Sequence, residues 1–330
     1  QSHFTTFLID HVREALNLNE QVILFQNRRG YTPLWMCEIC NWTPKCKNCD
    51  VSLTYHKHTN SLKCHYCSYN IPPVGSCSAC GSNRLNMLGF GTEKIEDELS
   101  LMFPDKVIKR LDLDTTRSKN AYSTLLNDFD NRKIDILIGT QMVTKGLDFD
   151  NVNLVGVLDA DMLLNRTDFR AFERSFQLMT QVAGRSGRRE KRGKVVIQTG
   201  DPEHWVIQKV IDHDFIGFFD SEIIERANYF YPPFYKIIEI TLKHRDENVL
   251  NKGASDLASA LRDIFKERVL GPEFPVVKRI QNLFLKTITL KIERDANDKK
   301  VKERIHQLVD EFYCVPINKS IRVIIDVDPA

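Results

Sequence analysis

Short apolar runs rich in β-branched residues recur along the first two thirds of the chain. Such runs are typical of strands that helices cover on both faces of a sheet. The predicted strands are residues 21–25, 107–113, 134–138, 152–158 and 194–199. Stretches with apolar residues at helical spacing surround them, and the predicted helices are residues 4–16, 92–102, 121–129, 168–182, 204–211 and 215–227. This alternation predicts an α/β domain with a parallel sheet, and Asp168 is the expected N-cap of its helix.

The pattern changes after Tyr231-Pro232-Pro233-Phe234, a rigid break that we interpret as a domain boundary. Polar and apolar positions then alternate, as they do in a half-buried strand. The predicted elements are strands at 236–243, 276–280, 283–292 and 321–327 and helices at 250–269, which Gly271-Pro272 ends, and 301–312. Their order, β-α-β-β-α-β, predicts a small split-βαβ domain.

Residues 37–80 interrupt the α/β pattern with many cysteines and little apolar periodicity. Eight of the nine cysteines of the chain form four Cys-x-x-Cys pairs: Cys37/Cys40, Cys46/Cys49, Cys64/Cys67 and Cys77/Cys80. Each pair makes a tight turn that aims two sulfurs at one point, so two pairs complete a tetrahedral zinc site. A segment so short and so poor in apolar residues needs metal for its folding free energy. The eight thiolates therefore predict two structural zinc ions.

The four turns can pair in three ways, of which we prefer the nested one. Residues 53–62 can fold as a hairpin that joins the inner turns, and closing the inner site lowers the loop-closure cost of the outer site. The nested sets are Cys46, Cys49, Cys64 and Cys67 on one ion, and Cys37, Cys40, Cys77 and Cys80 on the other. His56, His58 and His65 are alternative ligands that eight cysteines make unnecessary, and a disulfide framework is the alternative to metal.

Two predicted strands end in loops, residues 140–148 and 159–165, at the edge where open parallel sheets bind ligands. The helix that follows ends in Gly-Arg-Ser-Gly-Arg. It brings three polar side chains to one place: Gln181, Arg185 and Arg188. The glycines leave the guanidiniums room to approach a phosphate. The alternative is a solvated basic loop without a ligand.

A length of 330 residues indicates two or three domains. The net charge of +2 is close to neutral, so a surface that binds nucleic acid must be local. No apolar run is long enough to span a bilayer, and no signal peptide opens the sequence. Together with the paired cysteines, these features favour a reducing cytosol.

Two stretches resemble motifs of a known superfamily. Gly-Thr-Gln-Met-Val-Thr-Lys-Gly-Leu-Asp-Phe, at 139–149, resembles motif V of superfamily 2 helicases, and Gln-Val-Ala-Gly-Arg-Ser-Gly-Arg, at 181–188, resembles motif VI. The Asn-Arg-Arg-Gly-Tyr loop at 27–31 is similar to motif IV.

A more specific resemblance comes from the residues that precede motif VI, which are Phe-Arg-Ala-Phe-Glu-Arg-Ser-Phe-Gln-Leu-Met-Thr. The chain resembles the primosomal replication-restart DNA helicases, the PriA (primosomal protein N′) family, from Phe4 to Pro329. It departs at Leu147, where the family usually has His, and at Ser186, where it usually has Ala. Neither difference removes a charged ligand group.

The resemblance implies an α/β, RecA-like helicase lobe, an inserted two-zinc ribbon module and a small α+β C-terminal domain. The lobe would be residues 1–30 and 85–228, the zinc insertion 31–84 and the C-terminal domain 229–330. The resemblance also implies the nested pairing of the cysteines.

The resemblance further implies that ATP binds between this lobe and another one. Arg185 and Arg188 would reach its phosphates as catalytic residues. The other nucleotide-binding residues would be Gly146, Asp148 and Gln181, and the DNA-binding residues Thr140, Arg28 and Arg29.

Neither a Gly-x-x-x-x-Gly-Lys-Ser/Thr sequence nor an Asp-Glu-x-His/Asp sequence occurs in the chain. The groups that hold ATP and Mg²⁺ are therefore expected on a first lobe that precedes this sequence. The resemblance thus implies the C-terminal part of an ATP-dependent 3′–5′ DNA helicase that is inactive as an ATPase alone. Such a protein recognises stalled or recombined replication forks and restarts replication by primosome assembly.

The implied cofactors are two Zn²⁺ per chain, with ATP and Mg²⁺ in the full-length enzyme. The implied partners are single-stranded and forked DNA, single-strand-binding protein, primosome proteins and the loader of the replicative helicase. The implied location is the bacterial cytoplasm, at the nucleoid and without a membrane. The alternative function is a non-catalytic, zinc-dependent adaptor that docks nucleic acid or protein.

Overall fold

The computed structural model describes residues 3–26, 34–56, 59–88, 92–111, 119–140, 149–165, 168–184 and 193–329. They belong to two compact units, Gln1–Pro33 with Gly89–Glu222 and Leu34–Leu88 with Ile223–Ala330. We call the first unit the lobe. The second unit contains the cysteine-rich module, residues 34–88, and the C-terminal domain, residues 223–330.

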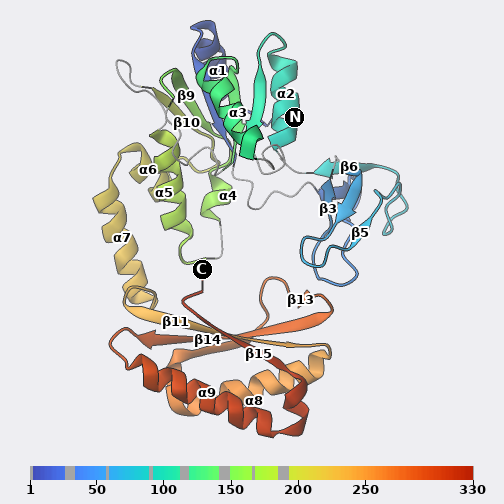
Figure 1. The fold of residues 1–330 in the computed structure, drawn as a ribbon, viewed down its shortest axis with the longest axis vertical. Coiled ribbons are helices and arrows are strands. Elements are labelled where there is room, and N and C mark those ends of the chain that lie inside the picture. Colours follow the sequence, from blue (N-terminus) through green and yellow to red (C-terminus); the bar gives the residue numbers. More distant parts are fainter. Residues whose placement is uncertain are drawn as a thin grey trace. The chain divides into compact units, whose positions relative to one another are not determined.

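A five-stranded sheet forms the centre of the lobe (Figure 1). Its strands, in spatial order, are β10 (Lys194–Ile197), β9 (Val152–Val157), β1 (Gln21–Phe25), β8 (Ile136–Gly139) and β7 (Ile108–Leu111). All four neighbouring pairs are parallel. Every residue of the central strand β1 is buried, as a strand covered on both faces must be. The predicted parallel sheet is confirmed.

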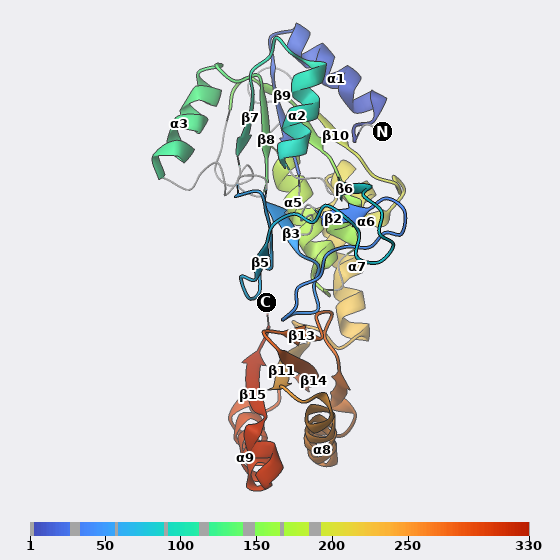
Figure 2. The same ribbon diagram turned by 90° about the vertical axis from the view of Figure 1, so that its right-hand side faces the viewer.

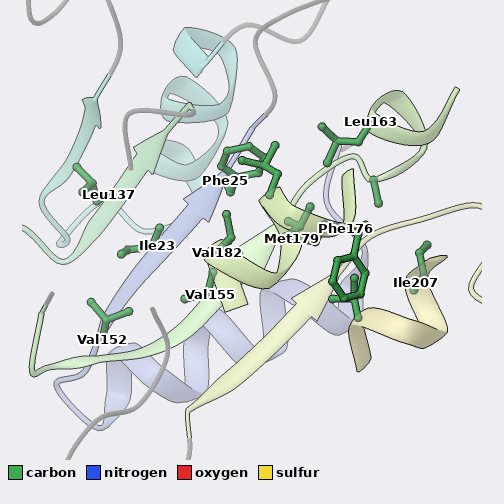
Figure 3. Close-up of a cluster of buried hydrophobic side chains, with 14 of the residues drawn as sticks. Ile23, Phe25, Leu137, Val152, Val155, Leu163, Phe176, Met179, Val182 and Ile207 are labelled. Atoms are coloured by element: carbon green, nitrogen blue, oxygen red, sulfur yellow. The ribbon is translucent and has the colours of Figure 1, made fainter. Parts of the chain in front are cut away.

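Helices cover both faces of this sheet, so alternate residues of each strand enter different cores. Val22 and Leu24 face a core with α1 (Thr6–Asn17) and α2 (Thr92–Met102). Ile23 and Phe25 face the other core, to which α3 (Lys119–Asp130) and α5 (Ala171–Ala183) contribute. Figure 2 shows α2 and α3 on opposite sides of the sheet, and Figure 3 shows Met179 and Val182 of α5 in the second core. The other helices that precede β11 in the sequence are α4 (Asp161–Leu164), α6 (Trp205–Ile211) and α7 (Phe215–Asn228).

Two details of the predicted helices are wrong. In the helix predicted at 4–16, Phe7 shares the helical spacing of the apolar residues, but its side chain is 63% exposed, and the buried residues of α1 are Leu8, Val12, Ala15 and Leu16. The later helix, α5, begins at Ala171, so Asp168 is not its N-cap. The Asp168 carboxylate instead accepts a hydrogen bond from the Arg170 amide and pairs with Arg174. A short side chain can satisfy a local turn in this way before the helix begins.

The cysteine-rich module contains a small sheet with the strand order β5 (Asn70–Ile71), β4 (Ser61–Lys63), β3 (Thr54–His56), β2 (Leu34–Cys37) and β6 (Leu85–Leu88). Strands β3 and β4 pair antiparallel, which confirms the hairpin predicted between the inner cysteine turns. Leu53 and Leu62 are fully buried, and they pack with Cys46, Cys49 and Cys64. The apolar core of this module is therefore small and built around sulfur atoms.

The C-terminal domain has one strand more than the predicted β-α-β-β-α-β order, because a strand that was not predicted precedes the predicted strand at 276–280, of which only Arg279–Ile280 is a strand. Its antiparallel sheet runs β12 (Val269–Glu273), β14 (Leu283–Glu293), β11 (Tyr235–His244) and β15 (Arg322–Val327), with the short β13 (Arg279–Ile280) beside β14. Helices α8 (Glu247–Phe265) and α9 (Asp298–Cys314) bury their apolar faces against this sheet. The prediction that Gly271-Pro272 ends a helix is wrong, because α8 ends at Phe265 and the dipeptide lies in β12.

Among the described residues, none of the helices combines the length and the apolarity that a bilayer crossing requires.

Candidate functional site

The structure gathers the eight paired cysteines into two sets. The outer site is Cys37, Cys40, Cys77 and Cys80, and the inner site is Cys46, Cys49, Cys64 and Cys67. Within each site the four sulfurs lie within 4.8 Å of one another. These are the sets of the nested arrangement, and the His56 and His65 rings, 5.2 Å apart, belong to neither set.

The four cysteine turns share one backbone conformation with a single exception. In each turn the first cysteine donates its amide to the carbonyl five residues later, as Cys37 does to Trp42 at 2.8 Å and Cys46 to Val51 at 2.9 Å. In three turns the residue after the second cysteine also donates its amide back to the first. These bonds are Asn41 to Cys37, Ser68 to Cys64 and Gly81 to Cys77, each at 2.9 Å. The same three donors have positive φ values of 59°, 60° and 73°. The exception is the turn at Cys46–Cys49.

Sulfurs within each site lie at hydrogen-bonding distance from one another. Cys37 and Cys80 lie 3.6 Å apart, and Cys46 and Cys67 lie 3.4 Å apart. Burial raises the pKa of Cys37, but the amides of Cys40 and Ile39 and the neighbouring thiols outweigh it and lower this pKa to about 7. The same balance holds for Cys67. Burial raises its pKa, but hydrogen bonds from neighbouring groups, the Tyr69 amide first among them, lower this pKa to about 7.

The donor set of both sites suits zinc. Four thiol sulfurs at mutual distances below 4.8 Å can close around one ion, and soft thiolates select zinc over hard cations. Burial of Cys37, Cys77 and three of the inner cysteines keeps solvent from the sulfurs. The two four-cysteine clusters are therefore consistent with two structural zinc ions.

We expect elemental analysis of the purified chain to return about two zinc ions per chain, because each closed tetrahedral site takes four thiolates. The measurement needs purification without chelators. A content of one ion or none would contradict the assignment of all eight thiolates.

The second candidate site lies at the carboxyl edge of the sheet in the lobe. Gln26 follows β1 and donates its amide to Gly139 at the end of β8, at 2.9 Å. Thr140, the first residue after β8, is 8% exposed, and its amide donates to Leu111 at 3.4 Å. The parallel strands therefore place Gln26 and Thr140 side by side at the edge where ligands bind in open sheets.

Two polar residues at this edge were not singled out from the sequence. The Gln26 side chain is fully buried, and within the described part of the chain neither of its amide atoms has a hydrogen-bond partner. Asp159 follows β9, and burial raises its pKa although the Met162 amide donates to its carboxylate at 3.1 Å. A polar residue directly after a buried strand is the signal that could have identified both.

The other predicted site residues are only partly described. Gln181 is exposed in the last turn of α5, beside the buried Val182 and Ala183. The predicted nucleotide and DNA ligands that lie outside the described residues are Arg28, Arg29, Gly146, Asp148, Arg185 and Arg188, together with the departures Leu147 and Ser186. The structure thus describes the strands and the helix from which these residues follow.

Three family models match the chain. The "PriA DNA helicase Cys-rich region (CRR) domain" matches residues 46–72, and the "Primosomal protein N C-terminal domain" matches residues 227–330. The "Helicase conserved C-terminal domain" matches residues 86–190, which include both loop motifs of the lobe. The solved structure of Dbp5 from S. cerevisiae bound to RNA and ADP BeF3 is 15% identical, with a TM-score of 0.31 over 66% of this chain and 41% of that one.

Curated relatives match the chain from end to end. The replication restart protein PriA of Bacillus subtilis is 38% identical over 331 residues, and that of Synechocystis sp. is 38% identical over 335 residues. Both alignments cover 100% of this chain but only 41% and 39% of the relatives, so the chain spans about two fifths of their length. The chain belongs to the PriA family of replication restart proteins and matches the C-terminal half of its members.

Proposed function

We propose that this chain provides the second lobe of an ATP-dependent 3′–5′ DNA helicase that restarts replication at stalled or recombined forks. The observation that carries the proposal is the match of residues 86–190 to the helicase C-terminal domain on a sheet whose strands are all parallel. Both features belong to one half of a two-lobed nucleotide site. ATP and Mg²⁺ then bind between this lobe and a first lobe of the complete protein.

Each loop at the carboxyl edge has a role in this proposal. Arg185 and Arg188 stabilise the charge that develops on the transferred phosphoryl group. Contacts to the nucleotide from the same lobe come from Gly146, Asp148 and Gln181. The single-stranded DNA backbone is held by Thr140, Arg28 and Arg29. Closure of the lobes around ATP and their reopening after hydrolysis move the DNA.

The second compact unit acts at the fork and on other proteins in this proposal. The cysteine-rich module separates the strands or docks a protein, and the partners are single-stranded and forked DNA, single-strand-binding protein and the primosome proteins that load the replicative helicase. The site of action is the bacterial cytoplasm, at the nucleoid.

The chain alone is expected to show no ATP turnover, with or without DNA, because it has neither the phosphate-binding lysine sequence nor the acidic Mg²⁺ sequence. The complete protein is expected to hydrolyse ATP when DNA is added. The direction in which the complete protein moves along DNA can be measured by strand displacement on duplexes with a 3′ or a 5′ single-stranded tail. Turnover by the chain alone, or unwinding that needs ATP but starts from the 5′ tail, would contradict the proposal.

A further inference from the structure

The tip of a hairpin in the C-terminal domain contacts the inner site. We call residues 279–282 the hairpin tip; it consists of β13 and the turn that leads into β14. Gln281 and Asn282 have φ values of 51° and 61°, as both central residues of a type I′ hairpin turn require. The Gln281 amide donates to Sγ of Cys49 at 3.2 Å. The two residues of this bond are 232 positions apart in the sequence.

Backbone hydrogen bonds join the hairpin tip to the cysteine turn on both sides of that sulfur. The Asn282 amide donates to the Asn48 carbonyl at 2.8 Å. The Asp50 amide donates to the Arg279 carbonyl at 2.9 Å. Together with the bond to Cys49, three consecutive residues of the turn thus have a backbone partner in the C-terminal domain.

These bonds explain why the turn at Cys46–Cys49 is the exception among the four. In the other three turns the residue after the second cysteine returns its amide to the first cysteine. Asp50 holds that position here, and its amide goes to Arg279 instead. The hairpin tip therefore provides the carbonyl acceptor that the first cysteine provides in each of the other three turns.

Side chains extend the same contact. The Arg279 guanidinium pairs with the Asp50 carboxylate at 3.1 Å, and the Gln281 side-chain amide donates to the Tyr66 carbonyl, next to Cys67, at 2.9 Å. Ile280 packs against the cluster of Leu53, Leu62 and the inner cysteines. The hairpin tip thus touches both turns that make up the inner site.

From these contacts we infer that the inner zinc site is a joint between the cysteine-rich module and the C-terminal domain. Gln281 is a positioning residue for this site, because its amide donates to the sulfur of a zinc ligand and its side chain holds the second turn. Hydrogen bonds onto a metal ligand fix its orientation and stabilise its charge. Zinc in the inner site and docking of the hairpin tip therefore strengthen one another, and this coupling is reciprocal. The outer site, whose turns bond to themselves, is independent of the C-terminal domain.

The first test changes side chains of the hairpin tip and measures how fast zinc is released. The double variant Arg279→Ala/Gln281→Asn removes the ion pair with Asp50 and shortens the side chain that reaches Tyr66, and asparagine tolerates the positive φ of the turn. Zinc release from the 330-residue chain into excess 4-(2-pyridylazo)resorcinol is followed by absorbance. We expect one of the two ions to leave about tenfold faster than in the parent chain, and the other ion to leave at the parent rate.

The matched control is Arg268→Ala in the same domain. Arg268 pairs with Glu293 through Nε and Nη2 within the C-terminal domain, so its loss removes an equivalent charge contact away from the cysteines. Both ions should leave Arg268→Ala at the parent rate. The inference fails if the double variant releases zinc as slowly as this control, or if it releases both ions faster.

The second test removes one cysteine ligand and measures the effect on the hairpin tip. Cys67→Ser removes an inner ligand and Cys40→Ser an outer one, and hydrogen exchange of residues 279–284 is followed by mass spectrometry in each variant. We expect faster exchange of this segment in Cys67→Ser alone, because the hairpin tip is bonded to the inner site. Equal exchange in the two variants would overturn the joint, whether or not either variant retains activity.

Discussion

Arg185→Ala and Arg188→Ala are each expected to lower the DNA-stimulated ATP turnover of the complete protein by about 10³-fold. The reason is that a guanidinium which meets the transferred phosphoryl group stabilises charge that is larger in the transition state than in the ground state. The loss should therefore appear in kcat, while the KM for ATP changes little. Steady-state ATPase assays with saturating single-stranded DNA measure both quantities.

The matched control for this prediction is Arg174→Ala, which removes an arginine from α5, the helix that precedes the arginine motif. Arg174 is exposed near the start of α5, where it pairs with Asp168. This position is far in sequence from the arginine motif. Its variant should keep the parent turnover within a factor of about two, since a surface ion pair contributes little. If Arg185→Ala and Arg188→Ala also keep it, the helicase proposal loses its mechanism. The zinc-dependent adaptor then becomes the better explanation.

Cys49→Ser is expected to remove the inner zinc ion and to unfold much of the cysteine-rich module. Structural zinc contributes about 10 kcal/mol or more of folding free energy to small zinc domains. The apolar core here offers little compensation, because its fully buried leucines are Leu53 and Leu62 and they pack against the cysteine sulfurs themselves. The zinc content found by elemental analysis should fall from about two ions per chain to about one, and amide hydrogen exchange in strands β3 and β4 should become fast.

Cys314→Ser is the matched control for that change. Cys314 is exposed at the end of α9, and its thiol donates to the Asp310 carbonyl of the same helix, at 3.5 Å. This variant should keep the zinc content and the exchange pattern of the parent. A Cys49→Ser chain that still holds two zinc ions would show that another residue replaces the missing ligand.

The central features of the fold could be predicted from the sequence because they leave local patterns. A strand that is buried on both faces must be apolar throughout, and β1, β8 and β9 are largely so. The sets of cysteines were predictable because the spacing within each turn is fixed and the hairpin β3–β4 brings the inner turns together. The alternating burial of β11 likewise matches the sequence pattern that predicted a strand with one face on a core.

The remaining features depend on contacts that a sequence does not display. Gln281 and Asn282 are ordinary turn residues, and nothing in the sequence around them indicates a partner 232 residues earlier. Asp168 has the residue type of an N-cap, but a local turn and Arg174 satisfy its carboxylate before α5 begins. The sequence favours a helix break at Gly271-Pro272, because a strand with a proline at a sheet edge is the less common case. The roles of Arg185 and Arg188 rest on the family resemblance and on the assays described above.

The bond between Gln281 and Cys49 has a consequence for the order of events during translation. The ribosome makes the four cysteine turns long before the segment that completes the inner one. At about 5–20 residues per second, the 232 residues from Asp50 to Gln281 take roughly 12–46 s to synthesise. Until the hairpin tip leaves the exit tunnel, the nascent chain therefore has the four inner cysteines without the contacts that the tip makes with Cys49 and Asp50. A protein truncated before this hairpin would lack those contacts permanently.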